Sequence, residues 1–355
     1  MDQHCRPRMP RNRLWCLGIV TLAAMLTAAS APRYDWSTAD LSYVGGVAAL
    51  RGAAASRALC ARLIALRPPP ADIADTRQAK ALERCSSEAL LYGIGHPADP
   101  VAARRCAWRE YAIAQSDDGP PLDYFRGAGI LAVAYANGWG GPRDMDMAIH
   151  MACGIDDAPA AMQARIDHLR ALARNGPGRK PFRICDDISS GMSGGVCAAH
   201  AASFRDQDRA HIVARWKRSW SPARRAAFDT VLASMTAYAE AAHTLDCHGG
   251  TAATQCTIDG VESDLTRFTA KIGALLGQNP SPAVPPLAER SNAATDAAGW
   301  AQFMRQLPPD ERALYETNGH QTIAARARFE RDLLAFTATI PGITPHQTRQ
   351  LFSDL

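Results

Sequence analysis

Eight cysteines follow an N-terminal segment with the layout of a secretory signal, and they constrain the fold of this 355-residue chain more than any other feature. They are Cys60, Cys85, Cys106, Cys153, Cys185, Cys197, Cys247 and Cys256. An even number of cysteines in an exported chain predicts a set of disulfides, because disulfides form and persist in oxidising compartments. We therefore expect all eight to be oxidised, which leaves none as a metal ligand or a nucleophile.

Residues 1–29 predict a cleaved signal peptide. Four arginines between residues 6 and 13 form a positive n-region, and an uncharged apolar run from Leu14 to Ala29 follows them. Small residues close this run, and we expect cleavage after Ala29. An uncleaved membrane anchor is the alternative, because the run is at the short end of what spans a bilayer. The mature chain is then expected to be periplasmic or secreted, with no membrane attachment after cleavage.

The charge of the mature chain is close to zero. The whole chain carries a formal charge of +4, and the n-region arginines together with Asp2 supply +3 of it, which leaves about +1. The densest basic cluster, at residues 215–218, is typical of a solvated helix face. We therefore expect no nucleic-acid partner.

Composition and hydrophobic spacing predict an all-α protein. Alanine is abundant, runs of β-branched residues are nearly absent, and apolar residues recur at i, i+3, i+4 and i+7. The clearest segments of this kind run from Phe228 to Tyr238 and from Leu265 to Leu275. Proline clusters at 68–70, 120–121 and 280–286 separate the helical segments, because proline cannot donate the intrahelical hydrogen bond.

Two stretches of the N-terminal half align at an offset of 45 residues. The matching pairs are Gly93 with Gly138, Gly95 with Gly140, Asp99 with Asp144, Ala103 with Ala148 and Ala107 with Ala152. Each stretch predicts a helical hairpin: the glycines can take the positive φ of a helix C-terminus, and the aspartate can cap the following helix. Hairpins of this kind stack into a solenoid.

The pattern resembles the Sel-like repeat, a relative of the tetratricopeptide repeat, whose core is Y-x-x-G-x-G-x-x-x-D-x-x-x-A. Residues Tyr135 to Ala148 match this core, whereas the first copy has its tyrosine displaced to Tyr92. A third, degenerate helical unit is expected between Leu50 and Leu66. The resemblance implies a protein-interaction scaffold over residues 35–176, and a helical packing module without a ligand is the alternative.

Cys185 and Cys197 enclose eleven residues rich in serine and glycine, and they predict a local disulfide. Closing a loop of this length is worth about 3 kcal/mol in the chain-entropy estimate. We expect helix to resume at Ala198. Cys247 and Cys256 enclose a second short loop between two periodic helices and predict another local disulfide. The four earlier cysteines allow three pairings, and helical spacing does not choose among them.

The region from Cys185 resembles the LprI-type lysozyme inhibitor family and its exported relatives. That family opens with a cysteine, about ten residues, then Cys-Ala and a helix with acidic residues. Cys185, Cys197, Ala198, Asp206 and Asp208 occupy those positions. The resemblance covers residues 182–276. Residues 287–355 form a C-terminal helical extension or belong to the same domain, because the family's Trp-x-x-x-Arg-Asp core is missing before 276 and has a diffuse counterpart between residues 319 and 334.

The resemblance implies a protein partner, with inhibition of a lysozyme-type cell-wall hydrolase as one form of the function. The candidate interaction loop consists of Ser189, Ser190, Met192 and Ser193, which the first disulfide would pre-organise. A structural staple with an idle loop is the alternative. Ten acidic and ten basic side chains lie between residues 182 and 273, and this balance argues against electrostatic capture of a basic lysozyme.

No group of residues predicts catalysis, and we expect no enzyme activity, metal or cofactor. Cys247, His248 and Cys256 lack the spacing of a zinc site, and oxidised cysteines do not bind zinc. The rival hypotheses are an envelope-acting hydrolase, with Asp186, Asp187 or His200 in its site, and a purely structural envelope protein.

Overall fold

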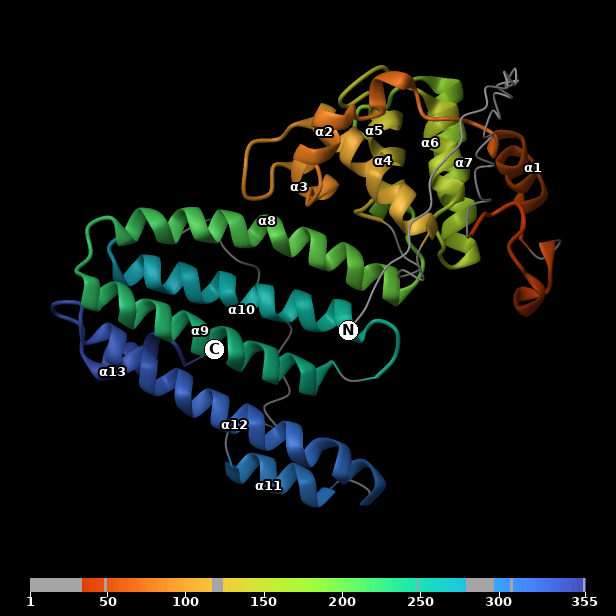
Figure 1. Ribbon diagram of the computed structural model, residues 1–355. Helices are drawn as coiled ribbons and strands as arrows, with labels where there is room; N and C mark the ends of the chain where they lie inside the picture. Colours follow the sequence, from red (N-terminus) through yellow and green to blue (C-terminus); the bar gives the residue numbers. More distant parts are fainter. Residues whose placement is uncertain are drawn as a thin grey trace, which may run out of the picture. The chain divides into compact units, whose positions relative to one another are not determined.

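The computed structural model describes residues 34–47, 50–116, 124–247, 249–278, 297–306, 309–353 and 355. These described residues form helices and connecting turns without a β-strand, so the predicted all-α class is confirmed (Figure 1). The expected signal peptide, His248 and the proline clusters at 120–121 and 280–286 lie outside the described residues.

The helices, in chain order, are α1 (Ala53–Leu63), α2 (Thr76–Ala81), α3 (Ser87–Tyr92), α4 (Pro100–Ser116), α5 (Ala128–Asn137), α6 (Met145–Cys153), α7 (Pro159–Asn175), α8 (Gly191–Lys217), α9 (Pro222–Asp246), α10 (Ala253–Leu275), α11 (Ala297–Gln306), α12 (Pro309–Thr337) and α13 (Pro345–Leu351). Short 3₁₀ turns lie at Ser42–Val44, Pro70–Asp72 and Ile184–Asp187. No described helix has both the length and the apolar character needed to cross a bilayer.

Helices α3 and α4 form one hairpin and α5 and α6 form another, as the 45-residue offset predicts. Gly93 ends α3 with a φ of 73°, and Gly138 ends α5 with a φ of 70°. Four residues back, the carbonyl oxygens of Ala89 and Ala134 accept the hydrogen bonds that the two glycine N–H groups donate. A left-handed glycine of this kind satisfies a carbonyl that the helix end would otherwise leave unpaired.

The predicted aspartate caps are also present in both hairpins. The carboxylate of Asp99 accepts a hydrogen bond from the Ala102 N–H at 2.9 Å, and that of Asp144 accepts one from the Met147 N–H at 2.9 Å. The equivalent hydrogen bonds show that the two segments repeat in structure as well as in sequence.

Gly140 holds the second hairpin against the first. It has a φ of 79°, and a Cβ atom added there would lie 2.2 Å from the carbonyl oxygen of Pro100, the first residue of α4. Only glycine satisfies both the left-handed backbone and this close approach. The turn at Gly140 therefore serves packing between the two hairpins as well as within one.

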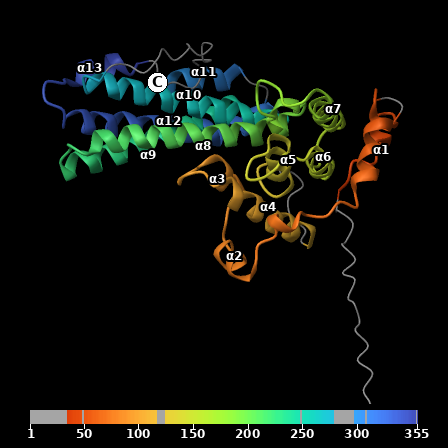
Figure 2. The ribbon, with the colours of Figure 1, turned by 90° about the horizontal axis from the view of Figure 1, so that it is seen from above.

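Helix α1 lies in the segment where a degenerate third unit is predicted, and it packs against α6 and α7 (Figures 1 and 2). The Cys60–Cys153 disulfide joins α1 to α6. Inside this contact the Trp36 indole N–H donates to the Ser56 hydroxyl at 2.8 Å, and that hydroxyl lies 2.6 Å from Oε1 of Gln163 on α7. A disulfide and a buried polar chain thus bring a segment near residue 60 onto helices about a hundred residues later.

The long helices after residue 190 pack side by side. Helix α10 contacts both α8 and α9, and α9 contacts both α10 and α12 (Figure 1). Phe336 on α12 and Phe352, the residue after α13, join the apolar core that α9 and α10 form around Phe228 and Phe268. The C-terminal residues therefore share one core with the cysteine-framed helices.

Helix α8 takes part in two apolar cores. Near its start, Val196 and Cys197 pack against the core of the repeat half, whereas Val213 and Trp216 belong to the core of the long helices. A helix of 27 residues is about 40 Å long, which is enough to reach both.

Four disulfides join the eight described cysteines. The predicted pairs Cys185–Cys197 and Cys247–Cys256 are present, and the four earlier cysteines pair as Cys60–Cys153 and Cys85–Cys106. The Cα–Cα distances run from 5.6 to 6.1 Å, within the ordinary range for disulfides.

Candidate functional site

Two of the four residues of the predicted interaction loop, Met192 and Ser193, are helical, so the expectation that helix resumes at Ala198 is wrong. Helix α8 begins at Gly191, and the Ser190 hydroxyl caps it by accepting a hydrogen bond from the Ser193 N–H at 3.2 Å. The glycines at the start of α8 allow close packing against α10. A Cβ atom at Gly191 would lie 2.4 Å from the Ala252 nitrogen, so glycine here lets α8 approach the start of α10.

Ser193 is buried in a polar network with the repeat half. Its hydroxyl donates to Asp157 at 2.7 Å and lies 3.0 Å from the Tyr124 hydroxyl oxygen, whose proton is donated to the same carboxylate. Arg165 reaches the same carboxylate at 2.8 Å, and the side chains of Arg165 and Asp157 are 0 % and 1 % exposed. Burial raises the pKa of Tyr124 to about 12, and its hydrogen bond to Asp157 adds to the shift. Of the predicted loop residues, Ser189 and Met192 remain exposed.

The structure does not bring together Asp186, Asp187 and His200, the residues of the hydrolase hypothesis. Oδ2 of Asp187 lies 2.9 Å from Nδ1 of His168 on α7. Nδ1 of His200 lies 2.5 Å from Oε1 of Glu88 on α3. Asp186 is exposed. Among the described residues Asp187 and His200 therefore each join two segments, and the three side chains do not form one acid–base centre.

His200 lies in an aromatic cluster between α3 and α8. Its ring stacks on Phe125 with centroids 3.7 Å apart, and it meets the Tyr92 ring edge-on at 4.7 Å. Burial raises the pKa of Tyr92 to about 12, and the Glu88 carboxylate adds to the shift. Two turns of α8 further on, the side-chain amide oxygen of Gln207 accepts a hydrogen bond from the Gly95 N–H at 3.1 Å. The His200 ring therefore packs between α3 and α8, and its Nδ1 atom contacts Glu88 within this interface.

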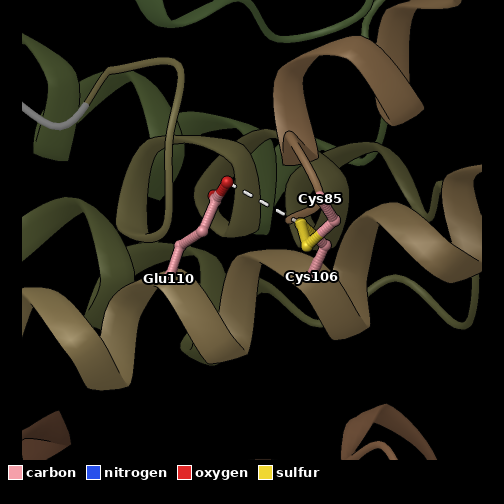
Figure 3. Close-up of side chains that lie close together, drawn as sticks. All are labelled: Cys85, Cys106 and Glu110. Atoms are coloured by element: carbon pink, nitrogen blue, oxygen red, sulfur yellow. Dashed lines mark hydrogen bonds between the residues drawn. A yellow bond between two sulfur atoms is a disulfide. The ribbon is translucent and has the colours of Figure 1, made fainter. Parts of the chain in front are cut away.

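Glu110 lies beside the Cys85–Cys106 disulfide, with Oε1 at 3.7 Å from Cys106 Sγ (Figure 3). Cys85, Cys106 and Glu110 lie close enough together to hold a metal ion, but the two cysteines would have to be thiolates to bind one. Here their sulfurs form a disulfide. The Glu110 carboxylate instead accepts hydrogen bonds from the Ser87 N–H at 3.1 Å and the Gly127 N–H at 3.0 Å. It therefore joins α4 to the starts of α3 and α5.

A groove of about 610 Å³ lies between α8 and α10, and we call it the α8–α10 groove. Its lining residues are Arg205, Asp208, Arg209, His211, Ile212, Arg215 and Trp216 from α8, Thr266, Thr269, Ala270 and Gly273 from α10, and Gln278. The α10 side contributes small side chains without charge. Helix α8 supplies the charged groups, three of which are arginines.

Two of these arginines are neutralised within the protein. The Glu262 carboxylate on α10 lies 3.0 Å from Nε of Arg205 and 2.9 Å from a terminal nitrogen of Arg209. Arg215 is exposed and has no carboxylate within ion-pair distance among the described residues. The uncompensated positive charge is therefore concentrated at the Arg215 end of the α8–α10 groove.

An adjoining hollow of about 330 Å³ extends this end, which we call the arginine end. It shares Arg215, Trp216 and Gln278 with the α8–α10 groove and adds Trp220 and Arg224, and its lining contains no carboxylate among the described residues. The Arg224 guanidinium lies over the Trp220 ring at 4.7 Å. Its Nε atom is buried without a hydrogen-bond partner among the described residues, and burial lowers the pKa of Arg224.

The sequence marks half of this site and misses the other half. The cluster at 215–218 is visible, but only Arg215 and Trp216 line the groove, whereas Lys217 pairs with Asp229 across the turn to α9. Arg224 is missed, because it comes to Arg215 only through the turn between α8 and α9. The pair Trp216 and Trp220, one near the end of α8 and the other in the turn that follows it, is the signal that could have located the site.

Comparison with known proteins gives no match: no protein-family model, no curated protein and no solved structure is significantly similar to the chain.

Proposed function

We propose that the mature chain is an exported protein-binding module and that its binding surface is the α8–α10 groove with the arginine end. The observation that carries the proposal is the pair Arg215 and Arg224, two guanidinium groups without a carboxylate partner among the described residues at the end of a concave surface. The Nε atom of Arg224 is buried without a partner among the described residues, which costs free energy that a bound anionic group would recover. Four disulfides support the exported part of the proposal.

Site-specific photo-crosslinking in cells that export the protein tests this function. Ile212 lines the α8–α10 groove, and Ala214 is an exposed residue on the same helix that does not line it. Replacing Ile212 by p-benzoylphenylalanine should give one adduct with a second protein, and replacing Ala214 should not. Equal adducts at both positions, or none at either in a folded protein, would contradict the proposal.

Inhibition of a lysozyme-type hydrolase is a narrower candidate, favoured by one observation. Met192 is 59 % exposed at the start of α8, where the Cys185–Cys197 disulfide fixes the backbone. An exposed apolar side chain on a rigid turn can enter a cleft at low entropic cost. The mature protein at stoichiometric excess should then lower lysozyme turnover, and M192E should relieve the inhibition. Unchanged turnover with the unsubstituted protein sinks this candidate.

The hydrolase alternative has a direct test. Purified peptidoglycan incubated with the mature protein alone should release no soluble fragments if the protein acts by binding. Fragments that disappear with D187N or H200A would establish the hydrolase. A purely structural envelope protein would show neither adducts at Ile212 nor fragment release.

A further inference from the structure

We infer that the arginine end receives carboxylate groups of an acidic, partly apolar peptide segment that lies along the α8–α10 groove. This inference rests on the proposed function and adds the chemistry of the partner. Arg215 and Arg224 come from different helices and line the same hollow. Guanidinium groups match carboxylates in charge and can bind them with two parallel hydrogen bonds.

The charged groups around the groove leave a positive field at one end. Arg205 and Arg209 share the Glu262 carboxylate, and Asp259 and Asp206 supply a second carboxylate to Arg205 and to Arg209, respectively. Asp208 is the acidic residue among the groove's lining residues, and the hollow at the arginine end has none in its lining. The Arg224 guanidinium packs on the face of the Trp220 ring at 4.7 Å, and this cation–π contact holds it in place before a ligand binds. Such pre-organisation lowers the entropic cost of binding.

The length and floor of the groove suit an extended peptide. From Arg205 to Trp216 the α8 helix rises about 16 Å, which about five extended residues would cover. Ile212, Ala270 and Gly273 give this stretch apolar surface. A peptide that alternates acidic and apolar residues places one kind of side chain on the arginines and the other on the apolar surface.

Other anionic polymers fit less well. A nucleic acid or another polyphosphate carries one negative charge at every repeat and would bring a phosphate against Asp208. A membrane surface is flat on this scale and would meet exposed cations such as Arg218 and Arg225 outside the groove before it reached Arg224. A peptide can place a neutral residue beside Asp208 and still reach both arginines.

Fluorescence anisotropy with a fluorescein-labelled Glu-Leu-Glu-Leu-Glu-Leu peptide and its Lys-Leu counterpart tests the inference on the mature protein. The Glu peptide should bind and the Lys peptide should not. R215A and R224A should each weaken Kd about tenfold or more, because each removes a charge-assisted hydrogen bond. R218A/R225A removes the same charge from exposed positions outside the groove, and it should change Kd less than twofold.

The outcomes separate the inference from the function on which it rests. Equal binding of both peptides would overturn the inference, as would an equal loss for R215A/R224A and R218A/R225A. So would binding of phosphatidylglycerol vesicles that depends on Arg215 and Arg224 in the absence of peptide binding. A protein adduct at Ile212 that is indifferent to R215A/R224A would overturn the peptide chemistry and keep the binding function. Peptide binding without any protein adduct would keep the chemistry and overturn the function.

Discussion

Replacing Asp157 by asparagine should strongly destabilise the fold. The Asp157 carboxylate accepts hydrogen bonds from Arg165 at 2.8 Å, from the Ser193 hydroxyl at 2.7 Å and from Tyr124. Asparagine keeps the size of the side chain but removes its charge. The guanidinium of Arg165, which is 0 % exposed, is then left inside the protein without its carboxylate. Removing one partner of a buried ion pair costs about 3–5 kcal/mol, and we expect D157N to lose this much free energy of unfolding.

Urea unfolding of the disulfide-intact mature protein, followed by circular dichroism, measures this loss. E330Q is the matched control, because Glu330 pairs with Arg326 at 3.0 Å but is 58 % exposed. An exposed pair of this kind should change the free energy of unfolding by less than about 0.5 kcal/mol. D157L/R165M removes both charges, and it should recover most of the loss that D157N causes.

Two results would refute the reasoning. The first is an equal loss of free energy of unfolding for D157N and E330Q. It would mean that water reaches the Asp157–Arg165 pair, in conflict with side-chain exposures of 1 % and 0 %. The second is a lower free energy of unfolding for D157L/R165M than for D157N. It would mean that Arg165 contributes through packing and not through its charge. High salt offers an independent check, because buried pairs are little screened and added salt should not rescue D157N.

Three further predictions concern the repeat half and the disulfides. G140A should lose more than about 2 kcal/mol of free energy of unfolding, because its Cβ would meet the Pro100 carbonyl oxygen at 2.2 Å. G95A has a similar φ with open space around the added Cβ and should lose about 1 kcal/mol. Equal urea midpoints for the two variants would contradict the packing argument. Burial lowers the pKa of the His150 imidazole, so its contribution to stability is present above about pH 6.5 and is lost as the pH falls below that value. In urea unfolding between pH 7.5 and 5, H150N should therefore show a weaker pH dependence of stability than the unsubstituted protein. Parallel pH profiles for the two proteins would contradict this prediction. Thiol titration of the denatured, unreduced mature protein should detect no free thiol, and any reproducible thiol signal contradicts the fully oxidised set.

The local features of the fold could be predicted because their causes lie within a few residues. A glycine that ends a helix and an aspartate that caps the next one act on nearby backbone groups. Gly93 and Asp99 therefore predict their hairpin from the sequence alone. The two short disulfides are predictable for the same reason. Cys60 and Cys153, in contrast, meet only after α1 has packed on α6, across 93 residues.

The candidate site was less predictable, because the same residue type serves two physical ends. Glycine near residue 191 indicates a flexible loop as readily as a close helix contact, and the second applies here. Arg215 is indistinguishable in sequence from any solvated helix arginine. Its significance depends on the absence of a carboxylate in the lining of the hollow that it shares with Arg224.

The double membership of α8 should make the described chain unfold as a single cooperative unit. Because Val196 packs against one core and Trp216 belongs to the other, melting either core withdraws support from the helix that completes its neighbour. A calorimetric scan should then show one transition even though the chain has two centres of packing. A protease that cuts within α8 would release both cores at once, so the long helix would be the most vulnerable segment if it ever became accessible.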